Sequence, residues 1–351
     1  MVPYLGYKLH PDIHYSYMHR GAPEVLEVDS LGFVHNGDPS ANVRLSKLPA
    51  DQIYRIVLFG GSTMAGQNSG NNSHTIPAYF ERLVRTEWPE ASVQVINAGV
   101  FGYNSTNERL RYELEFRRQW PGMVIFLDGY NDASVPMLTP DWHPHKSVIG
   151  LTQKDYLTMF SPAGSFLAWT GNLLRFPEPL ATLAVARRLR DRLIPASVRK
   201  VTDAPYHAEA SAVFEDNMAA IVAQVNAIKG RAIFALQPTL PLGKKPLSEN
   251  EAHLLTSLNN GSNHPTILSR YYEDFTALWV DMSRRFDGDN IQFIDLTSAF
   301  QDMNQHIYDD IVHYGPPGNE RLALLLFEAA RGGIGSDLAT HGYRRSGSAR
   351  E

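Results

Sequence analysis

The chain has 351 residues, of which 43% are hydrophobic and 20% are charged, the balance of a folded globular protein. Its formal net charge of −5, with no interleaving of basic and aromatic residues, argues against nucleic acid as a partner. The absence of cysteine excludes disulfides, a thiolate nucleophile and cysteine-bound zinc, but it leaves the redox compartment open.

The first residues, MVPYLGYKLHPD, have neither the basic flank nor the apolar core of a secretory signal. No run of about 18 apolar residues follows, so we expect the chain as given to be soluble. The cellular location stays open, because a leader or anchor outside this sequence is compatible with an extracytoplasmic protein.

Hydrophobic patterning divides the chain into short strands and longer helices. Residues 1–54 are rich in His, Tyr, Pro and Gly without sustained periodicity, which predicts an irregular arm laid across the core. The apolar run 56–59 ends at two glycines, which is typical of a buried parallel strand followed by a tight turn. We predict further strands at 93–96, 123–127, 232–236 and 291–296, and helices at 76–88, 105–120, 212–229, 267–286 and 318–331.

This alternation of strand and helix implies one α/β domain over 55–335, with a parallel sheet covered on both faces and ligands at the carboxyl ends of the strands. An insertion at about 133–211 is too long for a simple connection and is expected to cap the site. It holds the arginine-dense stretch 187–192, for which a solvated helix face is favoured and membrane contact stays an open alternative. Residues 336–351 are predicted to form a flexible polar tail.

The first segment that carries chemistry is Gly60-Gly61-Ser62-Thr63. Two glycines permit a sharp turn that puts Ser62 at the start of a helix, where free N–H groups favour developing negative charge. Ser62 is therefore a candidate nucleophile, and a helix cap or a phosphate-binding turn are the alternatives. The turn lacks the Lys of a P-loop and the flanking glycines of G-x-S-x-G, which argues against those two site types.

Two further segments, 100–105 and 128–132, each follow a predicted strand and offer hydrogen-bond donors. The backbone N–H groups of Ser62 and Gly102 and the side-chain amide of Asn131 are expected to converge on one oxyanion, as acyl transfer requires. The alternative for each segment is an ordinary turn.

The last segment holds Asp310 and His313, three residues apart, after the fifth predicted strand. At this spacing the carboxylate can hold the imidazole in one tautomer while the other ring nitrogen faces a serine. A metal site is the alternative at this position.

In this order, G-G-S-T, a glycine, G-x-N-D and D-x-x-H resemble the blocks of the SGNH/GDSL hydrolases over about 55–331. The resemblance implies a doubly wound, flavodoxin-like, five-stranded parallel sheet in three α/β/α layers, with strand order 2-1-3-4-5 and a helical insertion. It also implies roles for five residues: Ser62 as nucleophile, His313 as general base, Asp310 as its orienting carboxylate, and Gly102 and Asn131 as oxyanion donors with the Ser62 N–H.

The resemblance implies a carboxylic ester hydrolase that cleaves short-chain acyl esters through an acyl-enzyme, with no metal or organic cofactor. One departure is Gly61, which stands where the family's G-D-S-L version has Asp; we expect the nucleophile to be unaffected. Stacking on a sugar ring by Trp142, Trp169, Tyr103 and Tyr130, near the predicted cleft, would favour O-acetyl carbohydrate esters. The default alternative for these four residues is a place in the core or in the lid. The alternatives are an O-acyltransferase with the same site and a non-catalytic glycan-binding or assembly module.

Overall fold

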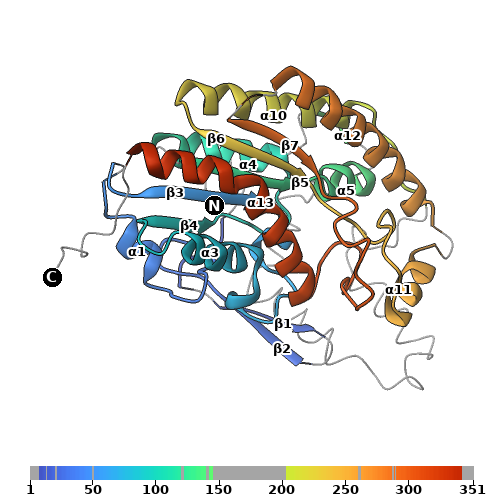
Figure 1. The fold of residues 1–351 in the computed structure, drawn as a ribbon. Coiled ribbons are helices and arrows are strands. Elements are labelled where there is room, and N and C mark those ends of the chain that lie inside the picture. Colours follow the sequence, from blue (N-terminus) through green and yellow to red (C-terminus); the bar gives the residue numbers. More distant parts are fainter. Residues whose placement is uncertain are drawn as a thin grey trace.

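The centre of the molecule is a five-stranded parallel sheet with the strand order β4-β3-β5-β6-β7 (Figure 1). Counted along the chain this is the order 2-1-3-4-5, so the predicted fold class is confirmed. The computed structural model describes residues 8–12, 14–19, 22–49, 51–119, 122–139, 142–144, 203–259, 262–286, 288 and 290–341. The sheet strands are β3 (Tyr54–Gly60), β4 (Val93–Asn97), β5 (Met123–Asp128), β6 (Arg231–Leu236) and β7 (Ile291–Asp295).

Strands β3, β4 and β5 are buried along their whole length, which explains why their sequences are mostly apolar. Their register is marked by a row of aromatic rings across four strands: Phe59 pairs with Phe126, Phe126 with Phe234, and Phe234 with Phe293. Successive rings are stacked with centroids 4.7, 5.3 and 4.7 Å apart. A slip of one residue would turn these rings to the opposite face, so the row fixes the alignment of the strand ends.

Helices cover both faces of this sheet, giving three layers (Figure 1). One layer consists of α4 (Ser105–Arg111), a π-helical turn η2 (Tyr112–Phe116), a 3₁₀ turn η3 (Arg117–Gln119), α5 (Tyr130–Leu138), α10 (Glu209–Ala227) and α12 (His264–Phe286). The other contains α3 (Ile76–Glu87) and α13 (Pro316–His341). Shorter helices are α1 (Ala41–Leu45), α2 (Ser62–Ala65), η1 (Asn72–His74) and α11 (Glu249–Asn259).

Helices α5 and α11 are absent from the predicted elements, because neither has a strong one-sided apolar pattern. Helix α5 and the first turn of α10 occupy the two ends of the predicted insertion 133–211. Its middle, with the arginine-dense stretch 187–192, lies outside the described residues.

The N-terminal arm contains more regular structure than its composition predicts. An antiparallel hairpin joins β1 (His14–His19) to β2 (Ala22–Glu27), and α1 follows. Leu26 and Val34 of the arm pack against Val100 and Tyr103, which belong to a loop that follows β4. The arm therefore lies on the core next to a predicted site segment.

Helix α13 extends ten residues beyond residue 331, where the pattern predicted its end, and into the predicted tail. Its last turns are fastened to the sheet by Asp337, which accepts hydrogen bonds from Arg231 at 2.9 and 3.0 Å and from the Tyr54 hydroxyl at 2.8 Å. A Cβ atom at Gly333 would lie 2.9 Å from Cδ of Arg231, so the glycine lets the helix lie close to the strand. This tertiary packing outweighs the low helix propensity of the glycines.

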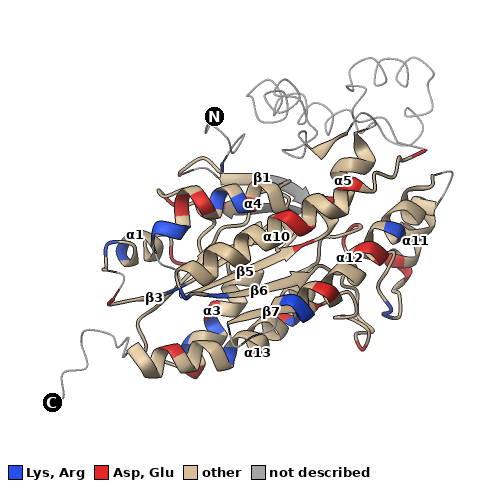
Figure 2. Cartoon of the chain, turned by 90° about the horizontal axis from the view of Figure 1, so that it is seen from above, with Lys and Arg blue, Asp and Glu red and all other residues tan. Residues whose placement is uncertain are grey.

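Within the described part of the chain, no helix is long and apolar enough to cross a bilayer. Acidic and basic residues are interspersed along the described helices (Figure 2).

Asp337→Asn should weaken the attachment of α13 to the sheet, because the amide cannot accept hydrogen bonds from both Arg231 and Tyr54 as a carboxylate does. We expect the free energy of unfolding to fall by about 1–3 kcal/mol, measured by urea denaturation. Asp302→Asn, at an exposed aspartate, serves as the matched control and should change it by less than about 0.5 kcal/mol. Equal effects of the two variants would contradict this role of Asp337.

Candidate active site

The turn after β3 carries Ser62, which is half-buried and is the first residue of α2. The helix has only four residues and ends at Gly66, whose φ of 106° lies in the left-handed region that glycine adopts without strain. The chain therefore presents Ser62 at the carboxyl edge of the sheet and then turns away.

Ser62 lies at one end of a chain of three polar side chains. Its Oγ is 2.6 Å from Nε2 of His313, and Nδ1 of His313 is 2.7 Å from Oδ2 of Asp310. Because an ionised carboxylate only accepts, Nδ1 carries the proton and Nε2 is left to accept the hydrogen bond of the Ser62 hydroxyl. In this arrangement the imidazole is placed to remove the hydroxyl proton.

The carboxylate of Asp310 is stabilised in its charged form. Partial desolvation raises its pKa, but hydrogen bonds from the His313 ring and from the backbone N–H groups of Val312 and His313 outweigh this and hold the pKa below its ordinary value. Both backbone groups donate to Oδ1 at 2.9 Å. Asp310 is therefore ionised at neutral pH.

The loop that follows β4 packs directly on the nucleophile turn. A Cβ atom at Gly99 would lie 2.3 Å from the backbone nitrogen of Ala65, so only glycine permits this approach. Gly102, further along the loop, has a φ of 75°. In the described part of the chain, neither the Gly102 N–H nor the Ser62 N–H donates a hydrogen bond.

Asn131 lies in the first turn of α5, against the backbone of Gly61. Its Nδ2 donates to the carbonyl oxygen of Tyr103 at 2.6 Å, and a Cβ atom at Gly61 would lie only 2.5 Å from the same nitrogen. The aspartate of G-D-S-L would displace Asn131 here, which accounts for glycine in this position.

The structure thus brings Ser62, His313 and Asp310 into one hydrogen-bonded chain and places Asn131 beside the same turn. Gly102 precedes Tyr103, whose carbonyl oxygen holds the Asn131 amide.

Further polar contacts, which no local sequence pattern indicates, join the turn of Ser62 to the loop of His313. Thr63 is buried; its hydroxyl donates to the Val312 carbonyl at 3.3 Å and accepts from Nε2 of Gln237 at 2.7 Å. Gln237 directly follows β6, so a polar residue at a strand's carboxyl end was the available signal for this residue.

A buried carboxylate, Glu251 of α11, holds the start of the same loop. It accepts from the backbone N–H groups of Ile307 and Tyr308 at 2.9 Å, from Nζ of Lys245 at 2.6 Å and from the N–H of Ser248 at 2.8 Å. Desolvation raises the pKa of Glu251, but Lys245 and these backbone donors outweigh it and lower the pKa to about 2.

The aromatic residues expected near the cleft differ in their burial. Trp142 and Tyr103 are buried in hydrophobic clusters and are therefore core residues, not surfaces on which a sugar ring can stack. Tyr130 is half-buried, and the Asp310 charge contributes to raising its pKa after desolvation. Trp169 lies outside the described residues. Among the described side chains, no group of three His, Cys, Asp or Glu residues is arranged to hold a metal ion.

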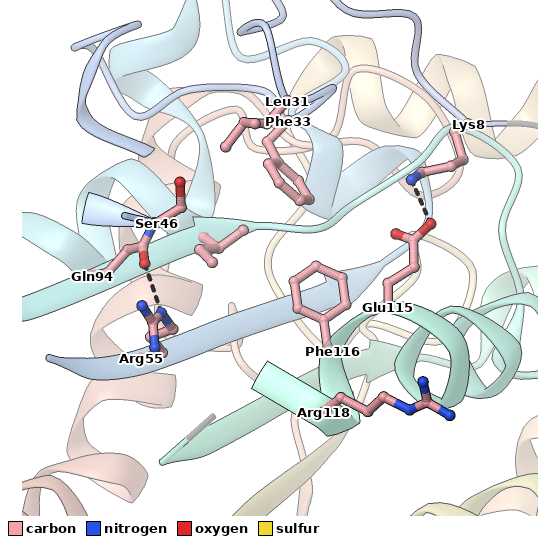
Figure 3. A pocket seen from close by; sticks show the side chains of 10 residues that line it. Lys8, Leu31, Phe33, Ser46, Arg55, Gln94, Glu115, Phe116 and Arg118 are labelled. Carbon is pink, nitrogen blue, oxygen red and sulfur yellow. Dashed lines mark hydrogen bonds and ion pairs between the residues drawn. The ribbon is translucent and has the colours of Figure 1, made fainter. Parts of the chain in front are cut away.

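A cavity of about 630 Å³ lies away from Ser62 (Figure 3). It is lined by Arg55 and Gln94, near the amino ends of β3 and β4, by Lys8 of the arm and by Glu115 and Phe116 of η2. The side chains that line it already pair with one another, as the Lys8–Glu115 and Arg55–Gln94 contacts show. This cavity is therefore not the site at the carboxyl edge.

No protein-family model matches this chain, and no curated protein matches it significantly. Among solved structures it is similar to the acetyl xylan esterase AlAXEase, with 14% identity and a TM-score of 0.44 over 78% of this chain and 98% of the other. It is also similar to Axe2, an acetylxylan esterase from Geobacillus stearothermophilus, with 13% identity and a TM-score of 0.42 over 78% and 93%. A GDSL-like lipase from Parabacteroides merdae has 13% identity and a TM-score of 0.42 over 81% and 98%.

Glu251→Gln removes the charge that compensates the fully buried Lys245. We expect a loss of about 3–5 kcal/mol in the free energy of unfolding by urea at pH 7, whereas Glu249→Gln, at an exposed position of the same helix, should change little.

The contribution of Glu251 to the free energy of unfolding should change with pH in a defined direction. Because folding lowers the pKa of Glu251 from an ordinary value of 4.5 to about 2, its contribution to stability is complete above pH 4.5 and is lost as the pH falls towards 2. The stability difference between wild type and Glu251→Gln should shrink over that window, and a difference that stays constant down to pH 2 would refute this assignment.

Proposed function

We propose that the protein is a serine ester hydrolase of the SGNH/GDSL type. The observation that carries the proposal is the hydrogen-bonded chain from Ser62 through His313 to Asp310. The half-buried hydroxyl, the ring nitrogen that accepts from it and the ionised carboxylate behind the ring are the three parts that nucleophilic acyl transfer needs.

In the proposed reaction, Ser62 Oγ attacks the ester carbonyl carbon while Nε2 of His313 takes the hydroxyl proton. The imidazolium that forms is stabilised by Asp310 and then gives its proton to the departing alcohol oxygen. A water molecule, deprotonated by the same nitrogen, attacks the acyl-enzyme and releases the acid and free Ser62. General-base help of this kind contributes roughly 10²–10⁴-fold.

The tetrahedral intermediates carry an oxyanion, for which we propose the N–H groups of Ser62 and Gly102 and the Asn131 amide as donors. In support, both backbone groups lack an acceptor among the described residues, and Asn131 retains a second amide hydrogen beyond the one that it donates to Tyr103. One such donor is worth roughly 10²–10³-fold in turnover.

As substrates we propose short-chain acyl esters, with O-acetyl groups of carbohydrates as the first to test. We propose that Tyr130, the half-buried member of the expected aromatic residues among those that the structure describes, contacts the sugar ring.

Hydrolysis of p-nitrophenyl esters of increasing acyl length tests this proposal. We expect the rate to fall with chain length, Ser62→Ala to lower kcat by roughly 10⁴-fold or more, and Asp310→Asn to lower it by roughly 10²–10⁴-fold. Mass spectrometry after reaction with a fluorophosphonate should place one adduct on Ser62. Unchanged hydrolysis by Ser62→Ala would sink the proposal.

The Thr63 hydroxyl is proposed to position His313 against Ser62 through the Val312 carbonyl. Thr63→Val, similar in shape but without the hydroxyl, should lower kcat by roughly tenfold to a hundredfold with little change in KM. Thr63→Ser, which keeps the hydroxyl, should recover most of that loss. Unchanged kcat in Thr63→Val, or no recovery in Thr63→Ser, would contradict this role of the hydroxyl.

A further inference from the structure

Three acidic side chains lie buried behind the site, where the loops that follow β4 and β5 meet. They come from different elements: Glu108 from α4, Asp128 from the last position of β5, and Asp132 from α5. Glu108 is 0% exposed and Asp128 4%. The proposed reaction uses none of them.

Asp132 is well supplied with hydrogen-bond donors. Its Oδ1 accepts from the Ser105 hydroxyl at 2.5 Å and from the Ser105 N–H at 3.2 Å, and the Gly129 N–H also donates to the carboxylate. Asn217 of α10 donates to the Ser105 oxygen at 2.9 Å from the other side. Burial raises the pKa of Asp132 to about 6 against these donors, so it is largely ionised at pH 7.

Glu108 and Asp128, unlike Asp132, have buried carboxyl oxygens without hydrogen-bond donors in the described part of the chain. Among the described residues, no N–H or hydroxyl donates to either oxygen of Glu108 or to Oδ2 of Asp128, although these atoms are buried. The side chain of Asp128 lies within hydrogen-bonding reach of the Glu108 carboxyl group. Carboxylate oxygens only accept, so a hydrogen bond between these two buried groups forms only while one of them carries a proton.

The charges around the pair favour that protonated form. Burial raises the pKa of Glu108 well above its ordinary value, and the charges of Asp128 and Asp132 raise it further. Arg111, one turn along α4, acts in the opposite direction. The loop before α4 contributes Tyr103, which burial keeps neutral, and α10 faces this region with the uncharged Asn217.

We propose that Glu108 and Asp128 share one proton, and that the resulting hydrogen bond holds the start of α4 against the end of β5 so that Gly102 and Asn131 stay in place. Gly102 precedes α4, and Asn131 is three residues beyond Asp128. Glu108 and Asp128 are thus positioning residues. The effect on turnover rests on the proposed function; the shared proton itself does not.

Loss of this proton to solvent leaves two adjacent buried carboxylates, which repel each other and separate the two loops. Turnover should therefore fall reversibly at alkaline pH as the pair ionises. Since the oxyanion donors act on the transition state, the alkaline decline should appear in kcat and leave KM nearly unchanged.

The test compares pH profiles of kcat and KM for p-nitrophenyl acetate between wild type and variants. Glu108→Gln can donate to Asp128 but has no proton to lose, so the alkaline decline should disappear. Glu108→Leu, with no hydrogen bond, should lower kcat roughly tenfold to a hundredfold at every pH. Glu328→Gln, at an exposed position of α13, should follow the wild type. An alkaline decline that persists in Glu108→Gln would overturn the proposal.

Infrared spectroscopy of the full chain in D₂O tests the proton without any reference to catalysis. At neutral pH the wild type and Glu328→Gln should show the carbonyl band of a buried protonated carboxylic acid, and Glu108→Gln should lack it. The band should disappear over the pH range in which kcat declines. Absence of the band in folded wild-type protein refutes the shared proton, whereas its presence in an inactive protein contradicts only the proposed function.

Discussion

A polar group that leaves water has to find its hydrogen-bond partner inside the protein, and this requirement organises the carboxyl edge of the sheet. The Thr63 hydroxyl is hydrogen-bonded to both Gln237 and Val312. Asp310 accepts hydrogen bonds from two backbone N–H groups as well as from the His313 ring. Glu251 accepts a hydrogen bond from the Ile307 N–H, at the start of the loop that carries His313. The proposed reaction therefore depends on groups that never contact the substrate.

The sheet could be predicted because its signal is local. Each strand is a short apolar run with a polar or glycine-containing turn after it, and the order of the turns along the chain indicated which of them share an edge. The packed core explains why this worked, since both faces of the central strands are covered and tolerate few polar residues. Helix α13 was predicted too short, because its last turns are held by Asp337 and not by their own pattern.

The candidate site was predictable only where spacing along the chain reflects distance in space. Asp310 and His313 are three residues apart, so their contact could be expected. Glu251 lies 57 positions before Tyr308, and Gln237 lies 174 positions beyond Thr63, and no local pattern reports such contacts. The glycine at position 61 could not be predicted for the same reason. Only glycine fits there because Asn131, which follows a different strand, lies against it.

The serine and the histidine of the site are separated by 251 positions in sequence. During synthesis, the segment with Ser62 leaves the ribosome long before the segment with His313, and the strands between them must be aligned before the two can meet. His313 is therefore synthesised only with the last part of the sheet domain. A nascent or prematurely terminated chain that stops before this segment lacks the proposed general base, so the proposed site can assemble only in the completed fold.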